Sequence, residues 1–245
     1  MQPEFQPLVT AVTTLCADLL ADRLTAIYLH GSVAMGDAVV GISDLDCFLV
    51  TRGALTEADT RALAQLEARL LTEYPIASEV HLAAHSTDDL AADSFARFIL
   101  KYNSTLIFGR DIVRELDRIN PTLEPNAATA KGRLSFARHC FSQALDGRQP
   151  DCTGPLPSDP YFVSRKFARY FVVIEGAYFL MSQNRFASFA GEDVLSKLAD
   201  YGFAEELSLA RAVLSDAKRA AVEPADFLRR VRPLVDWMFD ETDRA

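Results

Sequence analysis

The sequence predicts an α+β protein, in which an N-terminal α/β domain with a mixed sheet precedes a C-terminal helical bundle. Short strand-like runs alternate with helical patterns through residues 1–85. Beyond residue 85 strand signals fade, and segments with helical periodicity follow. The 245 residues, 49% of them hydrophobic, are enough to bury a core in one large domain or two small ones. We expect a border near residue 120, which gives domains 1–120 and 121–245.

Each element of the first domain has its own pattern. Apolar side chains recur at helical spacing in the first and fourth segments, whereas the others are short apolar runs typical of strands. The predicted elements are a helix over 5–21, a strand over 25–30, a strand over 43–50, a helix over 57–74 and a strand over 76–84.

The second half reads as helical throughout. A helix is predicted over 88–107, before the domain border. Within the second domain, helices are predicted over 127–145, 159–183, 190–201, 203–220 and 224–240. Segment 147–160 holds four prolines and two glycines and is predicted to be a loop between two of these helices. The aromatic side chains of 161–179 are interpreted as core of the bundle.

Charge is distributed unevenly along the chain. Residues 1–124 hold 9 Lys and Arg against 18 Asp and Glu, whereas residues 125–245 hold 16 of each. The acidic half is either a solubilising surface or a field that attracts divalent metals or a cationic substrate. Nucleic-acid binders usually carry a basic stripe, so we expect no nucleic-acid partner.

Neither the cysteines nor the N-terminal residues suggest an extracellular protein, and no membrane span is expected. The four cysteines form no C-x-x-C pair and are expected to be reduced thiols of the core. The N-terminus lacks the basic region of a signal peptide. The most apolar later stretch, residues 161–182, is interrupted by charged residues, so no membrane span is expected. We expect a cytoplasmic protein.

Two aspartates interrupt an otherwise apolar strand. Asp44 and Asp46 lie in ISDLDCFLV, residues 42–50. Residues two apart on a strand point to the same face, so the two carboxylates project together while Leu45 and Cys47 face the core. Two buried like charges need a cation nearby. Carboxylate oxygens suit Mg²⁺, which completes its coordination with water and phosphate oxygens. The pair therefore predicts a magnesium site.

A third acid and an anion-binding turn accompany the pair. Glu79 and His81 share a face of the strand predicted over 76–84, and Glu79 is either a third catalytic carboxylate or a surface acid. Gly31-Ser32 ends the first strand, where backbone N–H groups and the Ser32 hydroxyl can hold a phosphate. Glycine permits the close backbone approach that this requires. Together these groups suit transfer of a nucleotide from a triphosphate.

Two arginines of the helical half are further candidates. Arg165 and Arg169 are four residues apart on a predicted helix and share a face. They either reach phosphate oxygens of a nucleotide or form a salt-bridged helix surface.

The motifs resemble those of a known superfamily. HGSVAMGD (30–37) followed by SDLD (43–46) resembles the DNA polymerase β-like nucleotidyltransferases, whose motif is a Gly-Ser, a short helix and a D-x-D or D-x-E strand. The resemblance is close to small bacterial members, in particular the aminoglycoside adenylyltransferases that modify streptomycin and spectinomycin. SEVHLAAH (78–85) resembles their third motif, and LIFGRDI (106–112) a segment that ends this domain in many relatives. The helical half matches only in type.

The resemblance implies roles for individual residues. Gly31 and Ser32 would hold the triphosphate, and Asp44 and Asp46 would coordinate magnesium. Glu79 would be a third metal ligand, the base that deprotonates an acceptor hydroxyl, or both. Many relatives carry Arg at the position of Met35, so that phosphate contact is absent in this chain.

The implied activity is Mg²⁺-dependent transfer of AMP from ATP to a hydroxyl of a small molecule, such as an aminoglycoside, and hence antibiotic resistance. In the family the acceptor sits between the α/β domain and the helical domain. Two alternatives stay open: an enzyme that adds AMP to a protein, and a nucleotide-binding module without catalysis.

Overall fold

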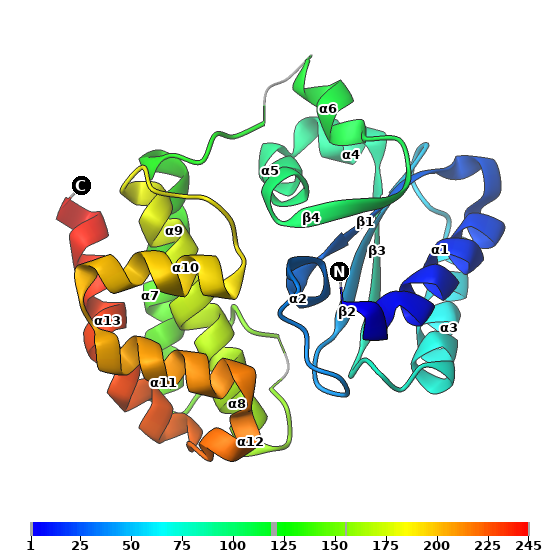
Figure 1. Ribbon diagram of the computed structural model, residues 1–245. Coiled ribbons are helices and arrows are strands. Elements are labelled where there is room, and N and C mark those ends of the chain that lie inside the picture. Colours follow the sequence, from blue (N-terminus) through cyan, green and yellow to red (C-terminus); the bar gives the residue numbers. More distant parts are fainter. Residues whose placement is uncertain (1, 119–121, 155, 245) are drawn as a thin grey trace. The chain divides into compact units, whose positions relative to one another are not determined.

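The computed structural model describes residues 2–118, 122–154 and 156–244. The chain forms two compact units, Met1–Leu123 and Glu124–Ala245. The first unit contains a four-stranded sheet in the order β3-β2-β1-β4 (Figure 1). Its strands are β1 (Leu24–His30), β2 (Leu45–Thr51), β3 (Val80–Ser86) and β4 (Ser104–Gly109). β2 and β3 are parallel, whereas β1 is antiparallel to both β2 and β4, which confirms the predicted mixed sheet.

Helices cover both faces of this sheet. The helical elements of the first unit are η1 (Pro3–Phe5), α1 (Gln6–Leu20), η2 (Ala21–Arg23), α2 (Gly31–Met35), α3 (Glu57–Glu73), α4 (Thr87–Ala92), α5 (Ser94–Tyr102) and α6 (Ile112–Asp117). α1 and α3 pack on one face, where Ile27, Leu45 and Leu49 belong to one buried core (Figure 1). α4, α5 and α6 contribute to a smaller core on the other face, with Tyr28 and Val50. The alternation along β2 therefore sends Asp46 to the face of the smaller core.

The prediction of one helix over 88–107 is wrong at its C-terminal end, because helix ends at Tyr102 and a strand begins at Ser104. The helix is divided at Asp93, whose carboxylate accepts hydrogen bonds from the amides of Phe95 and Ala96 and so caps α5. Ser104–Gly109 then forms β4, which pairs antiparallel with β1. A short apolar run has no periodicity that separates a strand from the end of a helix, and here sheet pairing decides.

Gly109, at the end of β4, is predicted to be essential to the pairing of β4 with β1. Its φ is +79°, and a Cβ at this position would lie 2.1 Å from the carbonyl oxygen of Thr25 in β1. Gly109→Ala is therefore expected to lower the free energy of unfolding by about 3 kcal/mol or more, measured by urea denaturation followed by far-UV circular dichroism. Gly53→Ala is the control, because Gly53 has φ +76° and no atom within 4 Å of a Cβ. Equal losses in both variants would contradict the prediction.

In the described part of the second unit, every regular element is helical. These are α7 (Ala127–Leu145), α8 (Pro160–Phe167), the π-helical segment η3 (Ala168–Ile174), α9 (Glu175–Ser182), α10 (Gly191–Leu198), η4 (Ala199–Tyr201), α11 (Ala204–Ser215), α12 (Ala217–Ala220) and α13 (Pro224–Arg244). The predicted helix over 159–183 is thus α8, η3 and α9 in succession. The helix predicted over 203–220 breaks at Asp216, whose side chain caps α12. No described helix is long and apolar enough to cross a membrane.

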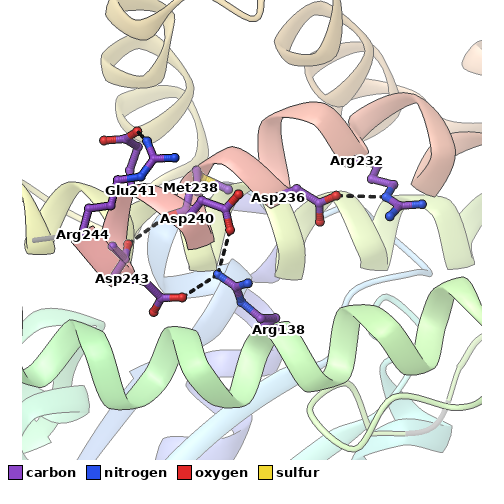
Figure 2. A network of polar contacts seen from close by, with 9 residues as sticks. Arg138, Arg232, Asp236, Met238, Asp240, Glu241, Asp243 and Arg244 are labelled. Carbon is purple, nitrogen blue, oxygen red and sulfur yellow. Dashed lines mark hydrogen bonds and ion pairs between the residues drawn. The ribbon is translucent and has the colours of Figure 1, made fainter.

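α7 and α13 pack against each other and are joined at the surface by charged side chains. Arg138 of α7 lies 3.2 Å from Asp240 and 2.9 Å from Asp243 of α13 (Figure 2). These groups are about half exposed, so the ion pairs contribute at most about 1 kcal/mol. Apolar burial holds the unit together. The core prediction is confirmed for Phe167, Phe171, Tyr178 and Phe179, whereas Tyr161, Phe162 and Tyr170 are only partly buried.

A buried ion pair lies inside this unit. Glu175 of α9 is fully buried and accepts a hydrogen bond from Nη2 of Arg133 of α7 at 2.8 Å. Burial raises the pKa of Glu175 from 4.5 to about 7, although the positive charge of Arg133 opposes this shift. A carboxyl group whose pKa is raised in the folded chain contributes its full stability below pH 4.5 and loses it as the pH rises toward 7.

We therefore expect the titration of Glu175 to lower the free energy of unfolding of this unit by roughly 2 kcal/mol between pH 5 and pH 8. Other titrating groups add their own contributions. Glu175→Gln should remove that part of the fall. The measurement is urea denaturation followed by fluorescence of Trp237, the only tryptophan, which packs against Phe179, Tyr201 and Phe203 of the same unit. The same pH dependence in both proteins would show that this carboxyl does not titrate as expected.

Candidate active site

The three acidic residues singled out by the sequence lie at one end of two neighbouring strands. Asp46 of β2 is opposite His30 of β1 and beside His81 of β3. Asp44 comes one residue before β2, and Glu79 one residue before β3. The amide of Leu45 donates to the carbonyl oxygen of Glu79 at 2.9 Å, which continues the parallel pairing beyond the strand ends.

This geometry corrects two strand boundaries without moving the acids off their shared face. The strands predicted over 43–50 and 76–84 begin at Leu45 and Val80. Residues 41–43 and 75–78 form turns and bends instead of strand. Leu45 and Val80 are paired and buried, so the residues before each of them fall on the opposite face by alternation. Glu79 is therefore the neighbour of Asp44 in the extended register.

Gly31 passes directly beside one of these carboxylates. It begins α2 with φ +71°, and a Cβ at this position would lie 2.6 Å from Oδ2 of Asp46. A larger residue would both strain the backbone and displace Asp46. The adjacent Ser32 has a buried hydroxyl oxygen that has no hydrogen-bond partner among the described residues. A buried, unsatisfied hydroxyl beside a carboxylate is a group that a bound polar ligand can complete.

Three of the four histidines lie on the same face of the sheet, and the sequence analysis passed over two of them, His30 and His85. The rings of His30 and Phe48 are 4.6 Å apart, and those of Phe48 and His85 are 4.8 Å apart. Burial, with smaller contributions from His81 and His85, lowers the pKa of His30 to about 4. His30 is therefore neutral near pH 7. Asp46 and Phe48 are two residues apart on one strand and so share a face. That alternation is the only sequence signal for this face, and it does not show that His30 and His85 on the neighbouring strands join it.

The donor groups fit a magnesium ion in kind. Among the residues that the structure describes, no three His, Cys, Asp or Glu side chains stand close enough to hold a metal. Mg²⁺ is usually bound by one or two carboxylates together with water and substrate phosphates, so a complete protein cage is not required. Asp44, Asp46 and Glu79 are all hard oxygen donors on one face. Their chemistry suits the ion.

The two arginines belong to the other unit. Arg165 of α8 is only 8% exposed, and its Nε donates to the carbonyl oxygen of Leu214 at 3.2 Å, so it is not part of a solvated surface. Arg169 is half-buried in the π-helical segment. Gly31, Ser32, Asp44, Asp46 and Glu79 thus lie together in the first unit, and the nucleotide contact of Arg165 and Arg169 stays a prediction.

Comparison with known proteins supports this reading of the fold. No family model and no curated protein sequence matches the chain. Among solved structures it is similar to spectinomycin adenyltransferase AAD(9) from Enterococcus faecialis, crystallised with ATP and spectinomycin. The alignment covers 97% of this chain and 99% of that one, with a TM-score of 0.54 and 10% sequence identity. At this identity the likeness establishes fold, and in its fold the chain resembles the aminoglycoside adenylyltransferases, as its motifs predict.

Proposed function

We propose that the protein is a Mg²⁺-dependent nucleotidyltransferase that moves AMP from ATP to a hydroxyl group of a small molecule. The observation that carries this proposal is the close approach of Gly31 to Asp46, with Asp44 and Glu79 next to it in the strand register. A glycine turn in close contact with carboxylates is suited to a triphosphate with its metal, because backbone N–H groups bind phosphate and carboxylates bind the metal. The fold shared with an adenyltransferase solved with ATP supports the same activity.

The proposed reaction is an in-line displacement at the α-phosphorus. Gly31 and Ser32 hold the triphosphate, and Asp44 and Asp46 hold Mg²⁺. Bound Mg²⁺ supplies charge neutralisation at the triphosphate and the departing pyrophosphate. Glu79 accepts the proton of the acceptor hydroxyl while the oxygen of that hydroxyl bonds to the α-phosphorus. The bond from that phosphorus to the bridging oxygen breaks, and pyrophosphate leaves.

The acceptor in this proposal is a polycationic small molecule of the aminoglycoside type. The adenyltransferase of similar fold was crystallised with spectinomycin, which supports a small-molecule acceptor. The first 124 residues carry an excess of nine acidic residues, since 18 Asp and Glu stand against 9 Lys and Arg. Such a field attracts both the metal and a cationic acceptor.

The test uses ATP labelled at the α-phosphate, with Mg²⁺, the purified protein and a panel of aminoglycosides, beside a size-fractionated cell extract. Transfer of label to streptomycin or spectinomycin, with release of pyrophosphate, is the expected result. Label on a protein band would instead establish a protein-modifying enzyme. ATP binding without transfer to any acceptor would leave a nucleotide-binding module and would contradict the proposal.

A further inference from the structure

The chain segments directly before Asp44 and Glu79 are hydrogen-bonded to each other. The amide of Ser78 donates to the carbonyl oxygen of Ser43 at 3.0 Å, and the Ser78 hydroxyl donates to the carbonyl oxygen of Ile42 at 2.7 Å. With the bond from the Leu45 amide to Glu79 and that from the Gly41 amide to the carbonyl oxygen of Ile76, four hydrogen bonds join the two chain segments that carry these acids. Neither segment is part of a strand at this point, so these bonds replace the ladder there.

The Glu79 side chain has a contact of its own. Nε2 of His81 lies 3.2 Å from Oε1 of Glu79, and both side chains are about half exposed. The imidazole and the carboxylate are thus in close polar contact. His81 is also the register neighbour of Asp46. It thus lies between Glu79 and the second aspartate along the face that carries the acids.

We propose that Ser78 and His81 are positioning residues that hold Glu79 beside Asp44, Ser78 through the backbone and His81 through the carboxylate. This inference rests on the proposed function. Half-exposed carboxylates on flexible side chains sample several orientations, whereas proton transfer and metal binding each need one. The bonds of Ser78 to the segment before Asp44 and the contact of His81 with the carboxylate each limit where Glu79 can lie relative to Asp44.

The experiment pairs each disruptive variant with one that keeps the hydrogen bond. Ser78→Ala removes the hydroxyl and Ser78→Thr keeps it. His81→Leu removes the donor, and His81→Gln puts an amide N–H near the place of Nε2. Thr72→Ala is a control that removes an exposed hydroxyl bond, to the carbonyl oxygen of Ala68. His139→Leu removes an exposed histidine that lies 3.7 Å from a carboxylate oxygen of Asp151 in the other unit.

Three quantities are measured: kcat, the KM for ATP, and Mn²⁺ affinity without nucleotide, read from the electron paramagnetic resonance signal of free Mn²⁺. Ser78→Ala and His81→Leu are expected to lower kcat about tenfold and to weaken Mn²⁺ binding, with KM for ATP within about twofold. Ser78→Thr and His81→Gln should recover most of both losses. The two controls should match the wild type.

Wild-type kcat and Mn²⁺ affinity in Ser78→Ala and His81→Leu would overturn the inference, as would Thr and Gln variants that behave no better than the Ala and Leu variants. The proposed function fails separately. If the wild type transfers label to no acceptor while the variants still lose Mn²⁺ affinity and regain it with Thr and Gln, the positioning stands and the proposed chemistry does not.

Discussion

Asp46→Asn is expected to reduce nucleotidyl transfer by roughly a thousandfold or more while the protein stays folded. Asp46 lies in the middle of the site, between His30 and His81 in the sheet and directly beside Gly31. A carboxylate that holds a metal in phosphoryl transfer contributes several kcal/mol of transition-state stabilisation, and each 1.4 kcal/mol is a factor of ten in rate. The amide is nearly the same size, so the turn at Gly31 should be undisturbed. The measurement is initial rate of label transfer, with circular dichroism and Tm as the test of folding.

The control for this variant is Asp18→Asn. Asp18 is an exposed residue of α1, which packs on the opposite face of the sheet, so the change removes the same charge from the same unit without touching the site. Its rate should stay within about twofold of the wild type, because an exposed charge at that distance is screened. Should Asp46→Asn transfer label at the wild-type rate, Asp46 would not be a metal ligand and the proposed mechanism would be wrong.

Gly31→Ala is the second change with a large expected effect. A Cβ at Gly31 would meet Asp46 Oδ2 at 2.6 Å, so either the carboxylate or the turn must move. The left-handed backbone at φ +71° adds about 1 to 2 kcal/mol of strain. Because a displacement of about 1 Å at a reacting centre lowers rates by about a hundredfold, we expect a loss of that size in kcat/KM for ATP. Steady-state kinetics with saturating acceptor measures it.

Gly36→Ala is the control that separates backbone strain from the steric contact with Asp46. Gly36 follows α2 in the same segment with φ +81°, but a Cβ there has no atom within 4 Å. It should lower Tm to a similar extent through backbone strain and should leave kcat/KM within about threefold of the wild type. If both glycine variants lose transfer activity equally, the close contact between Gly31 and Asp46 has no special role, and the lost activity results from lower stability of the fold.

Much of the site could be predicted from the sequence, because its parts are local in the chain. Asp44 and Asp46 are two residues apart, and alternation in a strand is enough to put them on one face. Gly31 and Ser32 follow an apolar strand at a point where a turn is needed. The resemblance of these motifs to those of nucleotidyltransferases supplied Glu79, for which spacing alone left a surface acid as the alternative.

Other features depend on pairing between distant segments, which periodicity does not encode. β4 was predicted as the end of a helix, and only its pairing with β1 makes Ser104–Gly109 a strand. The hydrogen bond from the Ser78 hydroxyl to Ile42 joins residues 36 apart, so neither residue signals it in the sequence. The lowered pKa of His30 results from burial and from histidines on another strand.

Three features of this protein can be derived from the sequence: an α/β unit with a mixed sheet, a helical unit, and an acidic motif that follows a glycine turn. Hydrophobic periodicity and turn chemistry act over a few residues, and those signals are legible along a chain. The tertiary structure alone decided that Glu79 neighbours Asp44, that Asp46 leaves space only for glycine at position 31, and that Glu175 and Arg133 are buried together. These are results of packing, in which each group's position is set by residues remote in sequence, and packing is specified by the whole core at once.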